Sequence, residues 1–259
     1  MLALSTTDAL AIVDPTLFKN ASSLAAHAQS LPSQPTATAW SQDNAAFFVA
    51  LSNTIHEYTP SGTPLKELFS GEDPITSLIA NDKGATLIFG ASNKIHVLEK
   101  TGKVAQTFVS HKSTITSLSL SNDCSLLAST SSSAVHVHNL TLGSHVVLRG
   151  LPPSAGQITT CVFHPHSRTR LIVGVGKQVL IFDSTKPSAP SKAVSIGDAN
   201  SGGVVAITCS PFSKTLVAVA TSGGQVGLVD MDKEKGYVIL RFFRDDCSCP
   251  FGSQALSNP

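Results

Sequence analysis

Residues 111–140, HKSTITSLSLSNDCSLLASTSSSAVHVHNL, contain three short segments with the character of β-strands, separated by polar turns. Apolar and polar residues alternate from Ile115, which is the pattern of a strand whose two faces differ. The Asn122-Asp123 pair follows, where a tight turn reverses the chain. A segment of small residues then leads to the short strand that begins at Val135. This order predicts three consecutive antiparallel strands.

The same plan recurs along the whole chain. Strands like the one at Val135 begin 40 to 47 residues apart, at Leu10, Ile55, Ile95, Val135, Val179 and Val226. Upstream of four of these, residues 75–92, 115–131, 158–176 and 205–222 repeat the alternating strand, the turn and the small-residue strand. A period of about 40–45 residues is typical of a four-stranded propeller blade. The sequence therefore predicts an all-β fold of the β-propeller type, with six repeat units.

The units also define the expected domain. A propeller is expected over residues 1–243, with a partial first blade at 1–20 followed by five blade units. Residues 244–259 show no alternation and are expected to form an irregular tail. An unclosed propeller exposes sheet faces and strand edges, so we expect the isolated chain to be prone to aggregation.

Composition restricts the partners. Of the 259 residues 14% are charged, and the formal net charge of +1 supplies no basic field for a phosphate backbone. No run approaches the ~20 apolar residues that a membrane span needs. The apolar stretch at the N-terminus is not preceded by the basic residues that are typical of a signal peptide. The five cysteines form no paired framework. We therefore expect a cytoplasmic protein that binds neither nucleic acid nor membrane.

Candidate chemical motifs give no site. His56, His96 and His136 recur every 40 residues, but equivalent positions in successive blades lie on different sheets and cannot converge on one metal ion at ~2 Å. They are expected on the outer face of the third strands. Residues 174–178, GVGKQ, lack the remaining residues of a phosphate-binding loop and predict a hairpin turn. No G-x-S-x-G elbow occurs, and the acids are scattered. The expectation is a non-enzymatic protein without catalytic, cofactor-binding or metal-binding residues and without a cofactor; its binding residues lie in variable loops and cannot be named.

The repeats resemble the WD40 family. The resemblance rests on His111, on residues 128–131 (ASTS), and on Phe182-Asp183 and Val229-Asp230 at the ends of later third strands. His138-Asn139 occupies the Trp-Asp position, and the only tryptophan, Trp40, lies in a first strand. The resemblance implies a hydrogen bond from His111 to Ser129 or Thr130. It also implies an incomplete seven-bladed ring; a poorly closed six-bladed ring and a ring completed by a partner remain the alternatives.

Within this family the chain is similar to the WD40 proteins that target the γ-tubulin ring complex, over most of residues 1–240. The matching residues are His111-Lys112, Thr116, Asn122-Asp123-Cys124, Ala128-Ser129, His138-Asn139, Ser210-Pro211-Phe212 and Lys214. This similarity implies an adaptor that places microtubule nucleators at the centrosome and spindle pole. The helical region with which that family binds the ring complex has no counterpart here. The alternatives are a WD40 adaptor of another assembly, in trafficking or ubiquitin ligation, and a propeller enzyme.

One loop could be regulated. Thr59-Pro60 and Thr63-Pro64 fit proline-directed phosphorylation, which would add charge to a polar loop. The favoured reading is that both prolines stiffen a connection.

Overall fold

The computed structural model describes residues 2–5, 9–13, 27–31, 33–41, 43, 45–81, 86–152, 156–196, 202–233 and 237–241. These residues form 23 strands and no helix. The strands make six antiparallel sheets, the first with three strands and the others with four. The predicted all-β class is confirmed.

Each sheet is a run of strands that are consecutive in the chain. The first consists of β1 (Leu2–Ser5), β2 (Ala9–Val13) and β3 (His27–Ser30). The second has β4 (Pro35–Trp40), β5 (Phe47–Leu51), β6 (Thr54–Tyr58) and β7 (Pro64–Ser70). The third has β8 (Ile75–Asn81), β9 (Thr86–Ala91), β10 (Lys94–Glu99) and β11 (Val104–Phe108).

The last three sheets follow the same order. The fourth has β12 (Ile115–Leu120), β13 (Leu126–Ser131), β14 (Val135–Asn139) and β15 (His145–Val147). The fifth has β16 (Ile158–Phe163), β17 (Arg170–Val175), β18 (Gln178–Asp183) and β19 (Lys192–Ser195). The sixth has β20 (Val204–Cys209), β21 (Leu216–Thr221), β22 (Gln225–Asp230) and β23 (Tyr237–Arg241).

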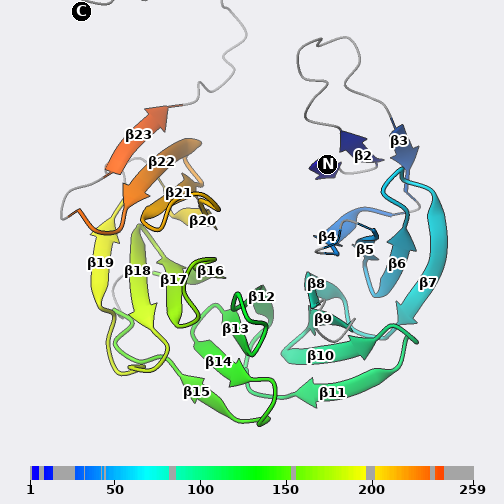
Figure 1. Ribbon diagram of the computed structural model, residues 1–259, viewed down its shortest axis with the longest axis horizontal. Coiled ribbons are helices and arrows are strands. Elements are labelled where there is room, and N and C mark those ends of the chain that lie inside the picture. Colours follow the sequence, from blue (N-terminus) through cyan, green and yellow to red (C-terminus); the bar gives the residue numbers. More distant parts are fainter. Residues whose placement is uncertain are drawn as a thin grey trace, which may run out of the picture.

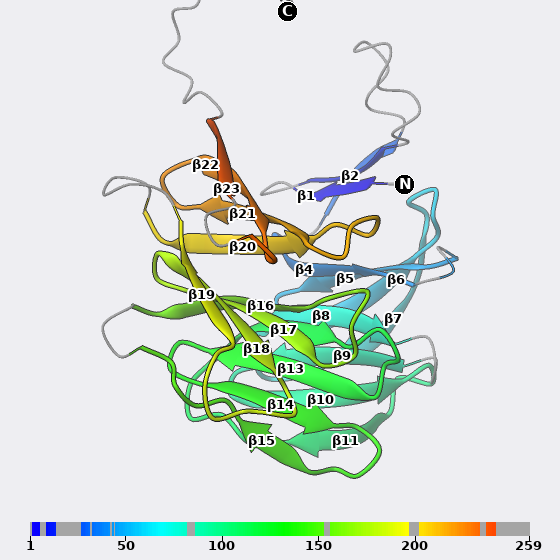
Figure 2. The same ribbon diagram turned by 60° about the vertical axis from the view of Figure 1, so that its left-hand side comes forward.

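The sheets stand one after another along an arc (Figure 1). In the four-stranded sheets the first strands β4, β8, β12, β16 and β20 lie on the inside of the arc and contact one another in that order. The last strands lie outside, and Figure 2 shows the stack turned by 60°. The sheets β1–β3 and β20–β23 stand at the two ends of the arc (Figure 1). This arrangement is consistent with a β-propeller.

The structure repeats in register with the sequence. The six anchor strands are β2, β6, β10, β14, β18 and β22, so the anchor is the third strand of every four-stranded sheet. The amide that opens each following sheet donates to the carbonyl of a β-turn in the sheet before it. These bonds are Ile75 to Ser52 (2.7 Å), Ile115 to Ser92 (2.8 Å), Ile158 to Ser132 (3.1 Å) and Val204 to Gly176 (2.6 Å). The same type of backbone hydrogen bond therefore recurs at four junctions between neighbouring sheets.

The core lies between sheets. Each large apolar cluster joins one sheet to the next, as where Val135 and Val137 pack against Leu171 and Phe182. Two glycines mark close approaches. A Cβ atom at Gly90 would lie 2.9 Å from Ile115 Cγ2, and one at Gly174 would lie 2.8 Å from Val204 Cγ1. Inner sheets are therefore buried on both faces, which explains their long apolar strands.

The turns follow the sequence signals. Gly176-Lys177 connects β17 and β18 as a two-residue hairpin, with Gly176 at φ 53°. The prediction of a hairpin at GVGKQ is confirmed. Ser52 (φ 56°) and Ser92 (φ 52°) occupy the equivalent turns. These residues adopt the left-handed conformation that a two-residue hairpin requires.

The first and last described strands show how far the expected domain extends at each end. The first sheet extends to Ser30, beyond the partial blade expected at 1–20, because it includes the third strand β3. The last described strand, β23, ends at Arg241, and the expected tail at 244–259 lies outside the described residues. In the part of the chain that the structure describes, no helix is long and apolar enough to cross a membrane.

Candidate interaction face

Three hollows of the molecule lie at one end of the sheets. This end carries the turns that follow β4, β12, β16 and β20, and we call it the turn face. Three hollows open on it: a first groove between the second and third sheets, a second groove between the fourth and fifth sheets, and a central depression. Each hollow is lined by residues of at least two neighbouring sheets.

The first groove has a volume of about 570 Å³. Its floor is apolar, with Phe48, Leu68 and Leu87 from two sheets. Its rim carries charges of both signs: Asp43, Glu57, Lys66, Glu99 and Lys100. An apolar groove is a form of site in which an amphipathic peptide segment can bind through its apolar face.

Within that rim, Lys66 Nζ lies 3.8 Å from Glu57 Oε2, and both lie partly exposed. The pKa of the Asp43 carboxyl is lowered, mainly by a hydrogen bond from Ser41 and the amide of Ala45, with a smaller contribution from the charge of Lys100. The rim carries side chains of both signs, the carboxyls of Asp43, Glu57 and Glu99 and the amines of Lys66 and Lys100, so it can pair with both acidic and basic groups of a partner.

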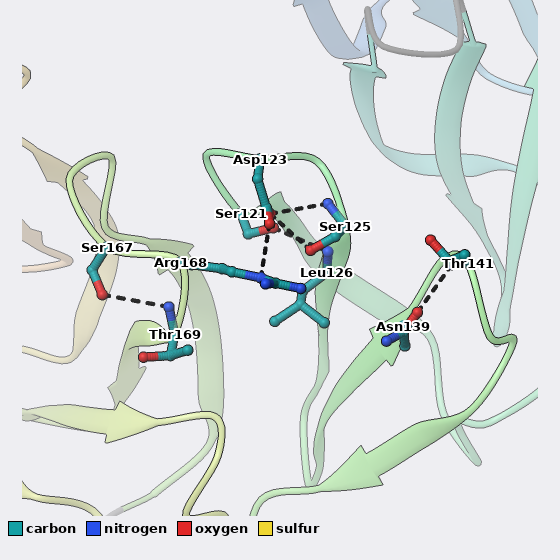
Figure 3. Close-up of polar contacts among 9 residues, drawn as sticks. All are labelled: Ser121, Asp123, Ser125, Leu126, Asn139, Thr141, Ser167, Arg168 and Thr169. Carbon is teal, nitrogen blue, oxygen red and sulfur yellow. Dashed lines mark hydrogen bonds and ion pairs between the residues drawn. The ribbon is translucent and has the colours of Figure 1, made fainter.

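The second groove, of about 420 Å³, has an ion pair at its edge. Arg168 Nε lies 2.7 Å from Asp123 Oδ2 and joins the β16–β17 turn to the β12–β13 turn (Figure 3). Further along the same end, Asn139 Oδ1 accepts from the amide of Thr141 at 3.0 Å. The groove is lined by Leu126, Val137, Asn139, Ser144, His145, Val146, Arg168, Thr169, Ser184 and Thr185.

Asp123 organises its own turn. Its Oδ1 atom accepts from Ser121 Oγ (2.6 Å), Ser125 Oγ (2.8 Å) and the amide of Ser125 (3.1 Å) (Figure 3). Partial burial acts to raise the pKa of Asp123, but these hydrogen bonds and the charge of Arg168 outweigh it and lower the pKa to about 2. The carboxylate is charged throughout the physiological range and holds Arg168 across the sheet boundary.

The central depression lies where the inner strands end. It has a volume of about 430 Å³ and brings Trp40, Leu120, Asn122, Phe163 and Pro165 together from three sheets. Aromatic and proline side chains at the mouth of a depression give contact area with little loss of side-chain entropy. Among the described residues, no acidic or basic side chain lines it.

A second cluster, of histidines, lies inside the fourth sheet. His111 Nε2 lies 2.8 Å from Ser129 Oγ, and Ser129 Oγ lies 3.0 Å from His138 Nε2. The predicted partner of His111 is therefore confirmed as Ser129. A serine hydroxyl has one proton, so it donates to one imidazole and accepts from the other. The two histidines must be opposite tautomers.

His136 belongs to the same cluster. Its ring centroid lies 4.3 Å from that of His111, 6.0 Å from that of His138 and 5.2 Å from that of His145. The expectation that His136 lies on an outer polar face is wrong, since the side chain is 6% exposed. The packing of β15 and His145 against β14 covers it. In the described part of the chain, no group of three His, Cys, Asp or Glu side chains has the geometry to hold a metal ion.

The equivalent histidines have local partners in their own sheets. His56 Nε2 lies 3.0 Å from Thr54 Oγ1, and His96 Nδ1 lies 3.0 Å from Thr107 Oγ1. Buried thiols offer no nucleophile either. Burial raises the pKa of Cys161 to about 12 and that of Cys209 to about 11, so both are protonated and unreactive at neutral pH.

The loop with the two Thr-Pro pairs is a tight turn. The hydroxyl of Thr59 accepts from the amide of Thr63 at 3.0 Å and lies 2.8 Å from Ser61 Oγ. Thr63 is exposed, and β7 begins at Pro64 directly after it. The hydroxyl of Thr59 thus holds the loop, whereas that of Thr63 faces solvent.

Sequence reasoning did not identify the grooves, because their residues come from different units. Asp123 and Arg168 occupy corresponding turns of successive repeats. The only sequence signal that these two turns lie on one face is the recurrence of polar turns at the repeat spacing. Compared with known proteins, the chain matches no protein-family model and no curated protein.

Proposed function

We propose that this chain is an incomplete seven-bladed WD40-type propeller that acts as a non-enzymatic scaffold. Its role would be to place the γ-tubulin ring complex, or spindle components that bind it, at spindle poles for microtubule nucleation. The protein would then work in the cytoplasm, at the centrosome and the cytoskeleton.

The observation that carries the WD40 assignment is the hydrogen-bonded chain from His111 through Ser129 to His138. His111 precedes the first strand, Ser129 lies in the second strand and His138 lies in the third strand. One buried polar chain therefore ties the segment before β12 to β13 and β14 of the same sheet. In this chain, His138 fills the place of the family's tryptophan and still supplies a nitrogen to Ser129.

The γ-tubulin assignment is supported by the sequence similarity of residues 111–139 and 210–230. The turn face offers surfaces on which partner proteins could bind. Two grooves with apolar floors or walls and mixed charges can take short segments from partner proteins. A scaffold needs such preformed surfaces and no reaction chemistry.

The test is to express the tagged chain in dividing cells and to image it together with γ-tubulin. Enrichment at spindle poles is the expected result. A diffuse signal from soluble, folded protein would overturn the γ-tubulin role and leave an adaptor of another assembly.

A charge-reversed variant shows whether the turn face is responsible. Lys66→Glu with Lys100→Glu inverts the basic part of the first groove. Lys112→Glu, an exposed residue before β12 at the opposite end of the sheets, is the matched control. Loss of pole enrichment in the double variant but not in the control is expected. Equal behaviour of both would place the contact elsewhere.

A propeller enzyme would instead need convergent carboxylates or metal ligands on the inside of the arc. The residues that line the central depression are Thr38, Ala39, Trp40, Leu78, Ile79, Ala80, Leu118, Ser119, Leu120, Ser121, Asn122, Phe163 and Pro165. That composition favours contact with a protein surface over reaction chemistry.

A further inference from the structure

The outer strand of the fourth sheet has an open edge. Among the described strands β15, with the sequence HVV, pairs with β14 alone, and it lies on the outside of the arc (Figure 1). All three of its residues are exposed, and Val146 and Val147 are each 42% exposed. Two other outer strands carry charges, Lys66 and Glu67 in β7 and Lys192 in β19. Charged side chains hinder the addition of a further strand to an edge, and β15 has none.

The pairing with β14 shows which backbone groups of β15 face this edge. The amide of Leu148 donates to the carbonyl of Val135 in β14 at 2.9 Å. In an antiparallel pair, residues that bond to the partner strand alternate with residues whose amide and carbonyl point away from it. The amides and carbonyls of His145 and Val147 therefore point outward. No described residue forms a hydrogen bond with these four groups.

The edge is closed at one end by the fifth sheet. The amide of Arg149, which also points outward, donates to the carbonyl of Pro187 in the β18–β19 loop at 2.7 Å. That loop packs tightly on Gly150, where a Cβ atom would lie 3.0 Å from the carbonyl oxygen of Ser188 and from Cα of Ala189. The loop is therefore held beside the edge, and it forms a preformed wall opposite β15.

A trough runs between β15 and this wall. A hollow of about 420 Å³ is lined by Val146, Val147, Arg149, Pro187 and Ser188. The second groove adjoins it, because Val146 lines both. We call the two hollows together the β15 trough. It follows residues 144–149 of the fourth sheet, which at about 3.3 Å per residue cover about 17 Å, so it can take an extended segment of about five residues.

The charges of the trough favour an acidic segment. Among the described residues its lining includes two arginines, Arg149 and Arg168, and no Asp or Glu. Arg168 is paired with Asp123 at 2.7 Å, whereas none of the ion pairs between described residues involves Arg149, which is exposed. A carboxylate of a partner can form a charge-assisted pair with its guanidinium. A second copy of this chain fits less well, because its own β15 trough would bring arginines and no lining carboxylate.

We infer that the β15 trough binds an extended acidic segment of a partner protein, which adds to the fourth sheet as a strand beside β15. The outward backbone groups of His145 and Val147 would bond to the backbone of the segment. Val146 would contact its side chains, and Arg149 would pair with its carboxylate. The inference rests on the proposed scaffold function, from which it takes that the ligand is a protein. Its test uses the purified chain, so its failure is distinguishable from a failure to localise at spindle poles.

Fluorescence anisotropy with short labelled peptides tests the backbone pairing. The two probes are Glu-Val-Thr-Val-Thr-Val-Gly and the same residues in reverse order, which together cover both strand directions. At least one of them should bind. N-methylation of alternate amides removes the donors of one edge of a probe. Methylation of one alternate set should weaken binding by about tenfold, and methylation of the other set should leave it unchanged. Equal effects of the two sets, or no binding of either probe, would overturn the inference.

A charge exchange tests the role of Arg149. Arg149→Glu should weaken binding of the acidic probe by about tenfold, and a probe with Lys in place of Glu should bind this variant better than it binds the unmodified chain. Lys186→Glu is the matched control, since Lys186 is exposed in the same β18–β19 loop and does not line the trough. It should bind the acidic probe as the unmodified chain does. Unchanged binding to Arg149→Glu would contradict the inference.

Two further measurements need no substitution. The amides of His145 and Val147 should exchange with solvent more slowly when the acidic probe is present, because they become hydrogen-bonded. Unchanged exchange would overturn the inference even if the Arg149→Glu variant failed to fold. Sedimentation of the chain with and without the probe tests the other occupant. Dimers that the probe dissociates would assign the edge to a second copy, and the inference would then be wrong.

Discussion

Ser129 Oγ and His138 Nε2 lie 3.0 Å apart, and neither side chain is exposed to solvent. The same hydroxyl also lies 2.8 Å from His111 Nε2, so one serine satisfies two buried imidazoles. The Nδ1 atoms of both histidines are buried without a hydrogen-bond partner. Loss of the Ser129 hydroxyl would leave His111 Nε2 without a partner and His138 Nε2 with only the longer contact, of 3.5 Å, to Ser110 Oγ.

Ser129→Ala should therefore destabilise the chain by about 1–3 kcal/mol, the cost of leaving buried polar atoms unsatisfied. Urea unfolding followed by circular dichroism measures the change. Ser131→Ala is the control, because Ser131 is buried in the same strand and its hydroxyl has no partner. That variant should change stability by less than about 0.5 kcal/mol. Equal effects would show that the hydrogen bonds to Ser129 contribute nothing specific.

The histidine cluster should make stability depend on pH. Burial, together with the charges of His136 and His145, lowers the pKa of His111 from 6.5 to about 4. Burial and the charges of His136, His145 and His111 lower the pKa of His138 to about 3. The unfolded chain therefore binds more protons below pH 6.5, and stability present above that pH is lost as the pH falls toward 4.

Between pH 7 and pH 5 this loss should be on the order of 2 kcal/mol for each histidine that stays neutral in the fold. His145 is exposed, and the other side chains of the cluster, Ser129, Ser110 and Phe108, carry no charge. Urea midpoints at several pH values measure the slope. His138→Phe removes one titrating group and should flatten the curve below pH 6.5. If the slope of stability against pH does not change in this variant, groups other than His138 cause the pH dependence.

The ion pair on the turn face should contribute less to the free energy of unfolding than the hydrogen bonds that Asp123 accepts within its own turn. Arg168 is 60% exposed, and pairs of this kind contribute about 0.2–1 kcal/mol. Asp123 also accepts three hydrogen bonds within its turn. Asp123→Ala should therefore cost about 1–2 kcal/mol and Arg168→Ala less than about 1 kcal/mol. A double-mutant cycle at low and high salt separates the two contributions; a coupling energy that does not fall with salt would contradict this assignment.

The repeat could be predicted from sequence because strand alternation and turn residues are local signals. The partner of His111 could be predicted because it lies in the same unit. The burial of His136 could not be predicted, because it requires β15 and His145 to pack against β14. That packing depends on which strands pair, and the local sequence pattern does not show it. The grooves also escaped prediction, because Asp123 and Arg168 meet only when two sheets stack. Sequence therefore predicted the unit, whereas the surfaces between units required the structure.

The close approach of sheets at Gly174 gives a last test. A methyl group there would lie 2.8 Å from Val204 Cγ1 and 3.1 Å from Thr160 Cγ2, inside van der Waals contact. Gly174→Ala should therefore push the fifth and sixth sheets apart and cost about 1–3 kcal/mol, as overpacking of a tight core does. The corresponding position of the sixth sheet is Ala220, on the face that no described sheet covers. Ala220→Val, measured by urea unfolding at low protein concentration, should change stability by less than about 0.5 kcal/mol. A large loss in that control would mean that a further part of the chain packs there, and a small loss at Gly174 would mean that the two sheets can separate at little cost.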